Sequence, residues 1–335
     1  MPPLLLVLIG LALFFSLLNG YRDSSNIVAT MISSRAVRPA VALAVTAAAE
    51  FSGPLIFGVA VAKTIGMDLV APSTVNLPVI IVALATACLW SLFTWVLHIP
   101  SSSSHALIGG LMGAAVAGAG WQAIQTGGLL KVLAGLLVSP LIGLTVGFLL
   151  TKLVMYLAQG ATPRINGFFK QSQLVTSVAL AFSHGTNDGE KSMGIITLGL
   201  VTAGHLSSFA VPLWVIVICS GMLALGTALG DWGLIKTVGT KFYKIRPVDG
   251  FSAQLTSAIV ILGASLLGGP VSTTQVVSSA IVGVGSAQRL SRVRWGVAGE
   301  ILFTWVLTIP ATILLAGGLY WVGAQALPLV TRLWP

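Results

Sequence analysis

The chain has 335 residues, of which 56% are hydrophobic and only 7% are charged. Soluble domains carry about 25% charged residues, so this composition excludes a soluble globular protein and indicates one that crosses a membrane several times. The net charge of +9 comes mainly from Lys and Arg in short gaps between apolar stretches, which is typical of cytoplasmic membrane loops and not of nucleic-acid binding. Cys88 and Cys219 both lie in apolar runs, which excludes a disulfide framework.

Because a bilayer core of about 30 Å needs roughly 20 apolar residues per helix, hydropathy divides the chain into candidate spans. The ten segments are 3–34, 39–62, 77–97, 104–119, 129–157, 173–203, 209–229, 251–269, 275–286 and 296–322. Polar residues at 20–26 and 185–191 are expected to break the first and sixth segments. Segments 104–119 and 275–286 are too short to cross comfortably, so each could be half of a re-entrant hairpin.

The polar interruptions recur within the chain. GYRDSSN (20–26) aligns with GTNDGEK (185–191), which matches Gly20 with Gly185 and Asp23 with Asp188. PSSSSH (100–105) aligns with PVSTTQ (270–275), and the order of segments is the same in both halves. The pattern predicts two five-segment repeats, 1–157 and 173–335, joined by a cytoplasmic linker at 158–172.

Basic residues set the orientation of these repeats. Twelve are predicted on the cytoplasmic side: Arg35, Arg38, Lys152, Arg164, Lys170, Lys236, Lys241, Lys244, Arg246, Arg289, Arg292 and Arg294. Since each repeat has an odd number of segments, the second repeat is inverted relative to the first. The predicted fold is an all-α polytopic membrane protein in which broken, re-entrant or short helices meet near the midplane. Inverted repeats with discontinuous helices are typical of secondary transporters.

After each interruption a helix is expected to restart behind hydroxyl or amide residues. These are Ser24, Ser25 and Asn26; Ser102, Ser103 and Ser104; Ser192; and Ser272, Thr273 and Thr274. Helix N-termini present free N–H groups and a partial positive charge, so converging starts would form an anion site. The alternative is that these residues only cap their helices.

Ionisable residues also fall at membrane depth. Five acidic residues lie within predicted spans or interruptions: Asp23, Glu50, Asp188, Glu190 and Glu300. A charge at the bilayer centre costs at least about 2.5 to 3.5 kcal/mol, so such residues are functional candidates, although pairing with Arg22 or Lys191 could be purely structural. His105 and His184 adjoin interruptions and could switch protonation. Zinc spacing, a P-loop and a GxSxG elbow are all missing from the sequence, so no resident metal, cofactor or enzymatic activity is predicted.

Four tracts together resemble a known family. Residues 20–30 and 183–194 resemble the duplicated GxNDxxN signature of the PiT family of inorganic phosphate transporters. PSSSSHALIGG and PVSTTQVVSSA resemble the P-x-S-x-[ST]-H tracts of that family, and EFSGPLIFG (50–58) is also similar. The resemblance implies a multi-pass plasma membrane protein of the prokaryotic type that imports phosphate, either free or as a metal-phosphate complex.

The resemblance also implies site residues. Those matching its signatures are Asp23, Asn26, Asn187, Asp188, Ser103, Ser104, His105, Thr273 and Thr274. The chain departs from the family pattern at Arg22, Lys191, Gln275 and Gln254, where cations or amides replace neutral or anionic ligands. We expect Arg22 and Lys191 to supply positive charge to phosphate, with Asp23 and Asp188 keeping these cations oriented.

These departures put sodium coupling in doubt and favour proton coupling. The candidates for the coupling ion are Asp23, Asp188, Glu50, Glu190 and His105, and the sequence does not choose among them. A sodium-coupled symporter and a transporter of another tetrahedral oxyanion such as sulfate are the nearest alternatives. An enzyme acting on a lipid phosphate and a channel are more distant ones. The expected partners are phosphate, a coupling ion and the lipid bilayer, with a homo-oligomer possible.

Overall fold

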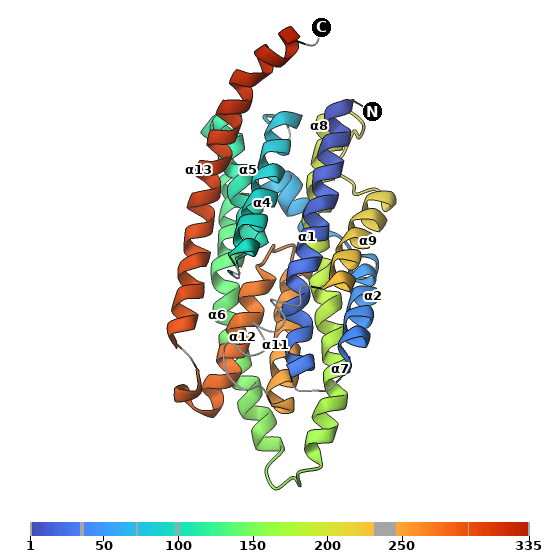
Figure 1. Ribbon diagram of the computed structural model, residues 1–335, viewed down its shortest axis with the longest axis vertical. Helices are drawn as coiled ribbons and strands as arrows, with labels where there is room; N and C mark the ends of the chain where they lie inside the picture. The colour runs from blue at the N-terminus through green and yellow to red at the C-terminus, as the bar shows by residue number, and fades with distance from the viewer. Residues whose placement is uncertain are drawn as a thin grey trace.

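The protein is an elongated bundle of helices (Figure 1). The computed structural model describes residues 2–33, 37–71, 73–97, 99, 101–230, 246–293 and 295–333. In chain order the elements are α1 (Pro3–Ser33), α2 (Pro39–Phe57), α3 (Ala60–Lys63), η1 (Thr64–Asp68), α4 (Leu77–Val96), α5 (Ser103–Ala119), η2 (Trp121–Ala123), α6 (Thr126–Leu157), α7 (Ile165–His184), η3 (Gly185–Gly189), α8 (Glu190–Thr202), α9 (Leu213–Leu229), α11 (Pro247–Leu266), α12 (Thr273–Gln288), η4 (Leu290–Arg292) and α13 (Trp295–Leu333). Each predicted apolar segment coincides with one helix or with consecutive helices. Six helices in the described ranges are long and apolar enough to cross a membrane, which confirms a multi-pass membrane protein.

Two helix pairs form hairpins that enter the bundle from opposite ends. α4 packs against α5 in the upper part of Figure 1, and α11 packs against α12 in the lower part. α5 and α12 have 17 and 16 residues, so each is about 25 Å long and short of a full crossing. The hairpin tips meet inside the protein, where the Ser104 hydroxyl donates to the Val271 carbonyl at 2.8 Å. The re-entrant arrangement predicted for the short segments is therefore present.

Helix contacts come in matched pairs, as two related repeats require. α5 packs on α13 as α12 packs on α6, and α1 packs on α9 as α2 packs on α7 and η3. The contact of α4 with α1 likewise matches that of α11 with α7. These pairs are consistent with inverted repeats, while the boundaries at 157 and 173 stay a prediction. α7 begins at Ile165, within the predicted linker, so the helical part of the second half starts earlier than expected.

The predicted break at residues 20–26 is wrong, because α1 runs without interruption from Pro3 to Ser33. At 185–191 the chain also stays helical and widens into the π-turn η3. The aligned glycines instead lie where two helices pack closely. A Cβ on Gly20 would collide with the backbone of Leu223 in α9, and one on Gly185 would collide with the backbone of Glu50 in α2. These glycines allow close helix packing, which small residues permit in membrane proteins.

A break that hydropathy does not reveal lies in the second segment. α2 ends at Phe57, Gly58 follows with φ at 87°, and α3 starts at Ala60. Such a positive φ is easily adopted only by glycine. The break places the N-terminus of α3 inside the bundle, where its N–H groups need partners.

The basic residues support the predicted orientation where they are described. The connections after α6 and α12, which contain Arg164 and Arg289, lie at the same end of the bundle, and both chain termini lie at the other (Figure 1). By the excess of positive charge the former end is the one predicted to face the cytoplasm. Five residues of the predicted cytoplasmic set lie outside the described ranges: Arg35, Lys236, Lys241, Lys244 and Arg294.

Candidate functional site

The hairpin tips present two helix N-termini at the centre of the protein. Ser102 is the N-cap of α5, and its hydroxyl accepts from the backbone N–H of His105 at 3.2 Å. Ser272 is the N-cap of α12 and accepts from the N–H of Gln275 at 3.4 Å. Because the hairpins enter from opposite ends, the positive ends of both helix dipoles face the interior. These two predicted helix starts are confirmed.

The two tips also contact each other through aligned residues. The amide nitrogen of Gln275 lies 3.3 Å from Nε2 of His105, and Nδ1 of His105 lies 2.7 Å from the Ser102 hydroxyl. His105 therefore joins the tip contact and the cap of α5. Ser103, next to the cap in the first turn of α5, is buried.

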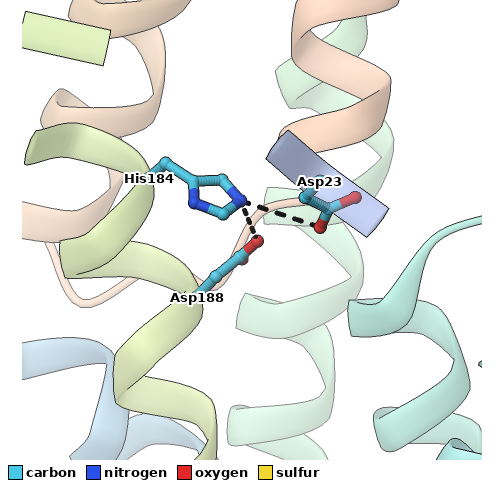
Figure 2. Close-up of side chains that lie close together, drawn as sticks. All are labelled: Asp23, His184 and Asp188. Atoms are coloured by element: carbon cyan, nitrogen blue, oxygen red, sulfur yellow. Dashed lines mark ion pairs between the residues drawn. The ribbon is translucent and has the colours of Figure 1, made fainter. Parts of the chain in front are cut away.

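The aligned acids Asp23 and Asp188 converge on one histidine. Nε2 of His184 lies 2.8 Å from Oδ2 of Asp188 and 3.7 Å from Oδ2 of Asp23 (Figure 2). Nδ1 of the same ring lies 2.7 Å from Oε1 of Glu50. All four side chains are buried. The convergence of the two repeats at a common centre, on which the sequence interpretation depends, is therefore present in the structure.

Hydroxyl and amide groups complete the bonding of the two acids. Thr273 donates to Asp188 at 2.9 Å, and Thr274 donates to Asp23 at 3.2 Å. Asn26 donates to Asp23 and to Thr274, both at 3.1 Å. The first turn of α12 thus binds the acids of both repeats. Five predicted site residues form this single network.

Two buried cations belong to the same region. Lys191 is fully buried, and its ammonium group pairs with Oδ1 of Asp188. A lysine is almost never fully buried unless it is paired. Arg22 is also buried and donates to the hydroxyl of Ser101 in the first hairpin tip at 3.2 Å. The predicted orientation of Lys191 by Asp188 is seen directly.

Two predicted residues have other partners. The carboxylate of Glu190 accepts from the backbone N–H of Ala62 at 3.0 Å, so it caps the N-terminus of α3 that the break at Gly58 creates. Asn187 donates to the Ser265 hydroxyl at 2.8 Å and accepts from the N–H of Val271 at 3.4 Å. Asn187 therefore holds the second hairpin tip in place from η3.

Glu50 and Gln254 each accept a hydrogen bond from a threonine of a neighbouring helix. Glu50 accepts from the hydroxyl of Thr227 in α9. Gln254 accepts from the hydroxyl of Thr176 in α7 at 2.7 Å. Each is buried and held by a threonine of a packed helix. Only Glu50 adds a carboxylate to the central cluster.

His184, noted in the sequence as a possible proton switch, was not included among the predicted site residues. It precedes Asp188 by four residues, a spacing that brings side chains together on a helix, and that spacing was the available signal. Asp23, His184 and Asp188 each offer one ligand atom, and these atoms lie within 4.8 Å of one another. Carboxylate oxygen and imidazole nitrogen can both bind cations. This geometry therefore does not support the prediction that the protein has no metal site.

Comparisons with known proteins point to one family. Residues 19–316 match the model of the phosphate transporter family. The probable low-affinity inorganic phosphate transporter of Rhizobium meliloti (strain 1021) is 44% identical, covering 95% of this chain and 96% of its own. The corresponding Bacillus subtilis (strain 168) protein is 43% identical, covering 95% and 97%. A solved structure described as "the sodium-dependent phosphate transporter" has a TM-score of 0.87 at 23% identity, covering 96% of this chain and 99% of that one, which shows that the fold is shared.

Proposed function

The chain belongs to the phosphate transporter family, and from that premise we propose that it imports inorganic phosphate by alternating access, driven by a proton gradient. The observation that carries the proposal is the convergence of Asp23 and Asp188 on the first turn of α12. Substrate sites of transporters with inverted repeats lie where such discontinuous elements meet.

Several groups at this centre suit phosphate. The helix starts at Ser102 and Ser272 favour an anion, and the hydroxyls of Thr273 and Thr274 can redirect their donors to its oxygens. Lys191 and Arg22 add fixed positive charge. Protonated phosphate also carries O–H donors, which Asp23 and Asp188 can accept, whereas sulfate has none at neutral pH. This difference favours phosphate over sulfate.

Charge at the centre supports proton coupling. When ionised, Asp23, Glu50 and Asp188 bring three negative charges, and Arg22 and Lys191 bring two positive ones. One negative charge remains, and it opposes the entry of an anion. A proton on His184 cancels it, because the imidazolium ring donates from both nitrogens, toward Glu50 and toward Asp188. A proton that is carried together with phosphate thus lowers the free-energy cost of burying the anion in the site.

Lys191 supplies the argument against sodium. Its ammonium group already occupies the position beside Asp188 where a coupling cation would be held. Among the proposed proton carriers, Glu50 is in contact with His184, whereas Glu190 caps a helix. The structure therefore favours Glu50 over Glu190 for this role.

Uptake by the purified chain in liposomes tests the coupling. An acid-outside pH gradient in sodium-free buffer is expected to accumulate radiolabelled phosphate, and an inward sodium gradient at equal pH is expected to have no effect. Accumulation that requires the sodium gradient and ignores the pH gradient contradicts the assignment.

Substrate identity is tested by competition with sulfate. We expect Asp188→Asn to lose phosphate uptake and to lose the preference for phosphate over sulfate, because an amide cannot accept through both of its terminal atoms. Asp68→Asn is the matched control, since Asp68 is partly exposed and lies 3.9 Å from Lys131, away from the central network. Equal inhibition of the unmodified chain by sulfate and phosphate would favour a general oxyanion transporter.

A metal-phosphate complex is a second candidate substrate, favoured by the cluster of Asp23, His184 and Asp188. If the complex is carried, phosphate uptake requires a divalent cation and a radiolabelled metal enters with it. Uptake that is unchanged after chelation of divalent cations removes this candidate.

A further inference from the structure

A cavity of about 540 Å³ lies between α6, α12 and α13, outside the network of acids and cations. Its walls are mostly apolar and include Leu137, Leu141, Val282, Leu302 and Trp305. This volume is within the range of ligand-binding pockets. At its inner end the cavity reaches His105 and Gln275, the pair through which the two hairpin tips touch.

The cavity opens toward the bilayer. Leu137 and Leu141 on α6 and Leu302 and Val306 on α13 line it, and each is more than half exposed. In a membrane-spanning bundle, exposed apolar side chains at this depth face lipid chains. The medium in contact with the mouth is therefore hydrocarbon.

The length and position of the cavity match one leaflet. Its lining on α13 runs from Trp295 to Ile309, a rise of about 20 Å along the helix. Half of a bilayer core is about 15 Å thick. Trp295 stands at the cytoplasmic end of α13, and tryptophan is enriched at membrane interfaces. The cavity thus extends from the inner interface to the middle of the membrane.

The cytoplasmic mouth carries positive charge. α12 ends at Gln288 and is followed by the sequence RLSRVR (289–294), in which Arg289 is exposed. The indole N–H of Trp295, which lines the cavity, donates to the carbonyl of Leu290 at 3.1 Å, so the backbone next to Arg289 is held beside the mouth. Anionic lipids of the cytoplasmic leaflet are attracted to such segments.

We propose that this cavity binds one acyl chain of an anionic phospholipid of the inner leaflet, with the headgroup at Arg289 and the chain end beside Gln275. The apolar walls match the chain, and the polar pair His105 and Gln275 closes the end of the cavity. The bound lipid would lie against the contact between the hairpin tips. This inference depends only on the placement of the helices in the membrane and not on the transported substrate.

Bromine-labelled lipids provide a direct test, because bromine on an acyl chain quenches nearby tryptophan fluorescence. The full chain is reconstituted in phosphatidylcholine vesicles containing increasing fractions of brominated phosphatidylglycerol, or of brominated phosphatidylcholine for comparison. Subtracting the quenching of a Trp305→Phe variant leaves the signal of Trp305. For each arginine that contacts the headgroup, we expect the same quenching of Trp305 at about a fivefold lower fraction of brominated phosphatidylglycerol than of brominated phosphatidylcholine.

Three variants separate the cavity from the general lipid surface. A Cβ on Gly299, which lines the cavity, has no atom within 4 Å, so Gly299→Phe is expected to fill the space and abolish the preference. Gly318→Phe is the matched control on the same helix, since that position is equally open and lies outside the cavity. Arg289→Gln, on the exposed end of α12, is expected to reduce the preference about fivefold without altering quenching by phosphatidylcholine.

Three results would overturn the proposal. Equal quenching of Trp305 by the two brominated lipids would indicate ordinary surrounding lipid. Unchanged preference in both Gly299→Phe and Arg289→Gln would place the bound lipid elsewhere. Absence of Trp305 quenching by either lipid would show that the cavity is closed or covered by a second copy of the chain.

Discussion

Replacement of Lys191 by asparagine tests whether its ammonium group takes the place of a coupling sodium ion. The substitution restores the residue found at this position in the signature that the chain resembles. It leaves the carboxylate of Asp188 with His184 and Thr273 but without its paired cation. Breaking a buried ion pair in this way costs about 3 to 5 kcal/mol. In potassium buffer we therefore expect phosphate affinity or the folded fraction to fall by about a hundredfold or more.

Sodium is expected to reverse part of that loss. A cation present at about 100 times its dissociation constant stabilises the protein that binds it by about 2.7 kcal/mol. Phosphate uptake in liposomes and thermal unfolding in detergent are therefore measured in sodium and in potassium. Lys191→Asn is expected to unfold at a higher temperature in sodium and to regain uptake there.

The matched control is Lys131→Asn. Lys131 is half exposed, donates to Thr64 at 3.0 Å and lies 3.9 Å from Asp68. An exposed pair of this kind contributes at most about 1 kcal/mol, so neither stability nor ion dependence should change much. If Lys191→Asn behaves identically in sodium and potassium while remaining folded, the ammonium group does not occupy a cation site and the reasoning fails.

Further substitutions test three separate features of the structure. Gly110→Ala is expected to lower the unfolding temperature, at a cost of about 1 to 3 kcal/mol, because the new Cβ would lie 2.7 Å from the Ala83 carbonyl; Gly127→Ala, in open space, should unfold like the unmodified chain. Glu50→Gln should abolish proton-driven accumulation in liposomes, whereas Glu190→Gln should reduce thermal stability and keep accumulation pH-dependent. Ser272→Ala removes the side-chain cap of α12. We expect this loss to weaken phosphate binding, measured by calorimetry, by about 1 kcal/mol.

Hydropathy predicted the helices well, because each of the ten apolar segments must satisfy its backbone groups internally in the membrane. The tips at Ser102 and Ser272 were also predictable, since a proline precedes each helix and hydroxyl residues lie at its start. The same reasoning failed at residues 20–26. A polar stretch can break a helix, or it can form a buried polar face of a continuous one, and only the packing partners distinguish these cases.

Contacts between distant residues account for what sequence reasoning missed. Glu190 caps α3 at a separation of 128 residues, and the helix start that it caps exists only because Gly58 interrupts the second segment. His184 joins the acids of both repeats, yet its contact with Asp23 spans nearly half of the chain. A single sequence carries no pairing information for such positions, whereas the local spacing of His184 and Asp188 was visible.

The aligned signatures also show how charge is shared between the repeats. The alignment matches Arg22 with Asn187 and Asn26 with Lys191, so each repeat has one cation and one amide in exchanged positions. Asn26 contacts Asp23 as Lys191 contacts Asp188, at a spacing of three residues in both cases.

Arg22 and Asn187, in turn, each bind the hairpin of their own repeat, at Ser101 and Ser265. Arg22 and Lys191 thus each contact a partner in their own half of the chain, whereas His184 contacts acids of both halves. The contacts of Thr274 with Asp23 and of Ser104 with Val271 instead cross between the halves. If one repeat rocks against the other, the contacts between the halves must break, including those of His184 with Asp23 and Glu50, whereas Lys191 moves together with Asp188.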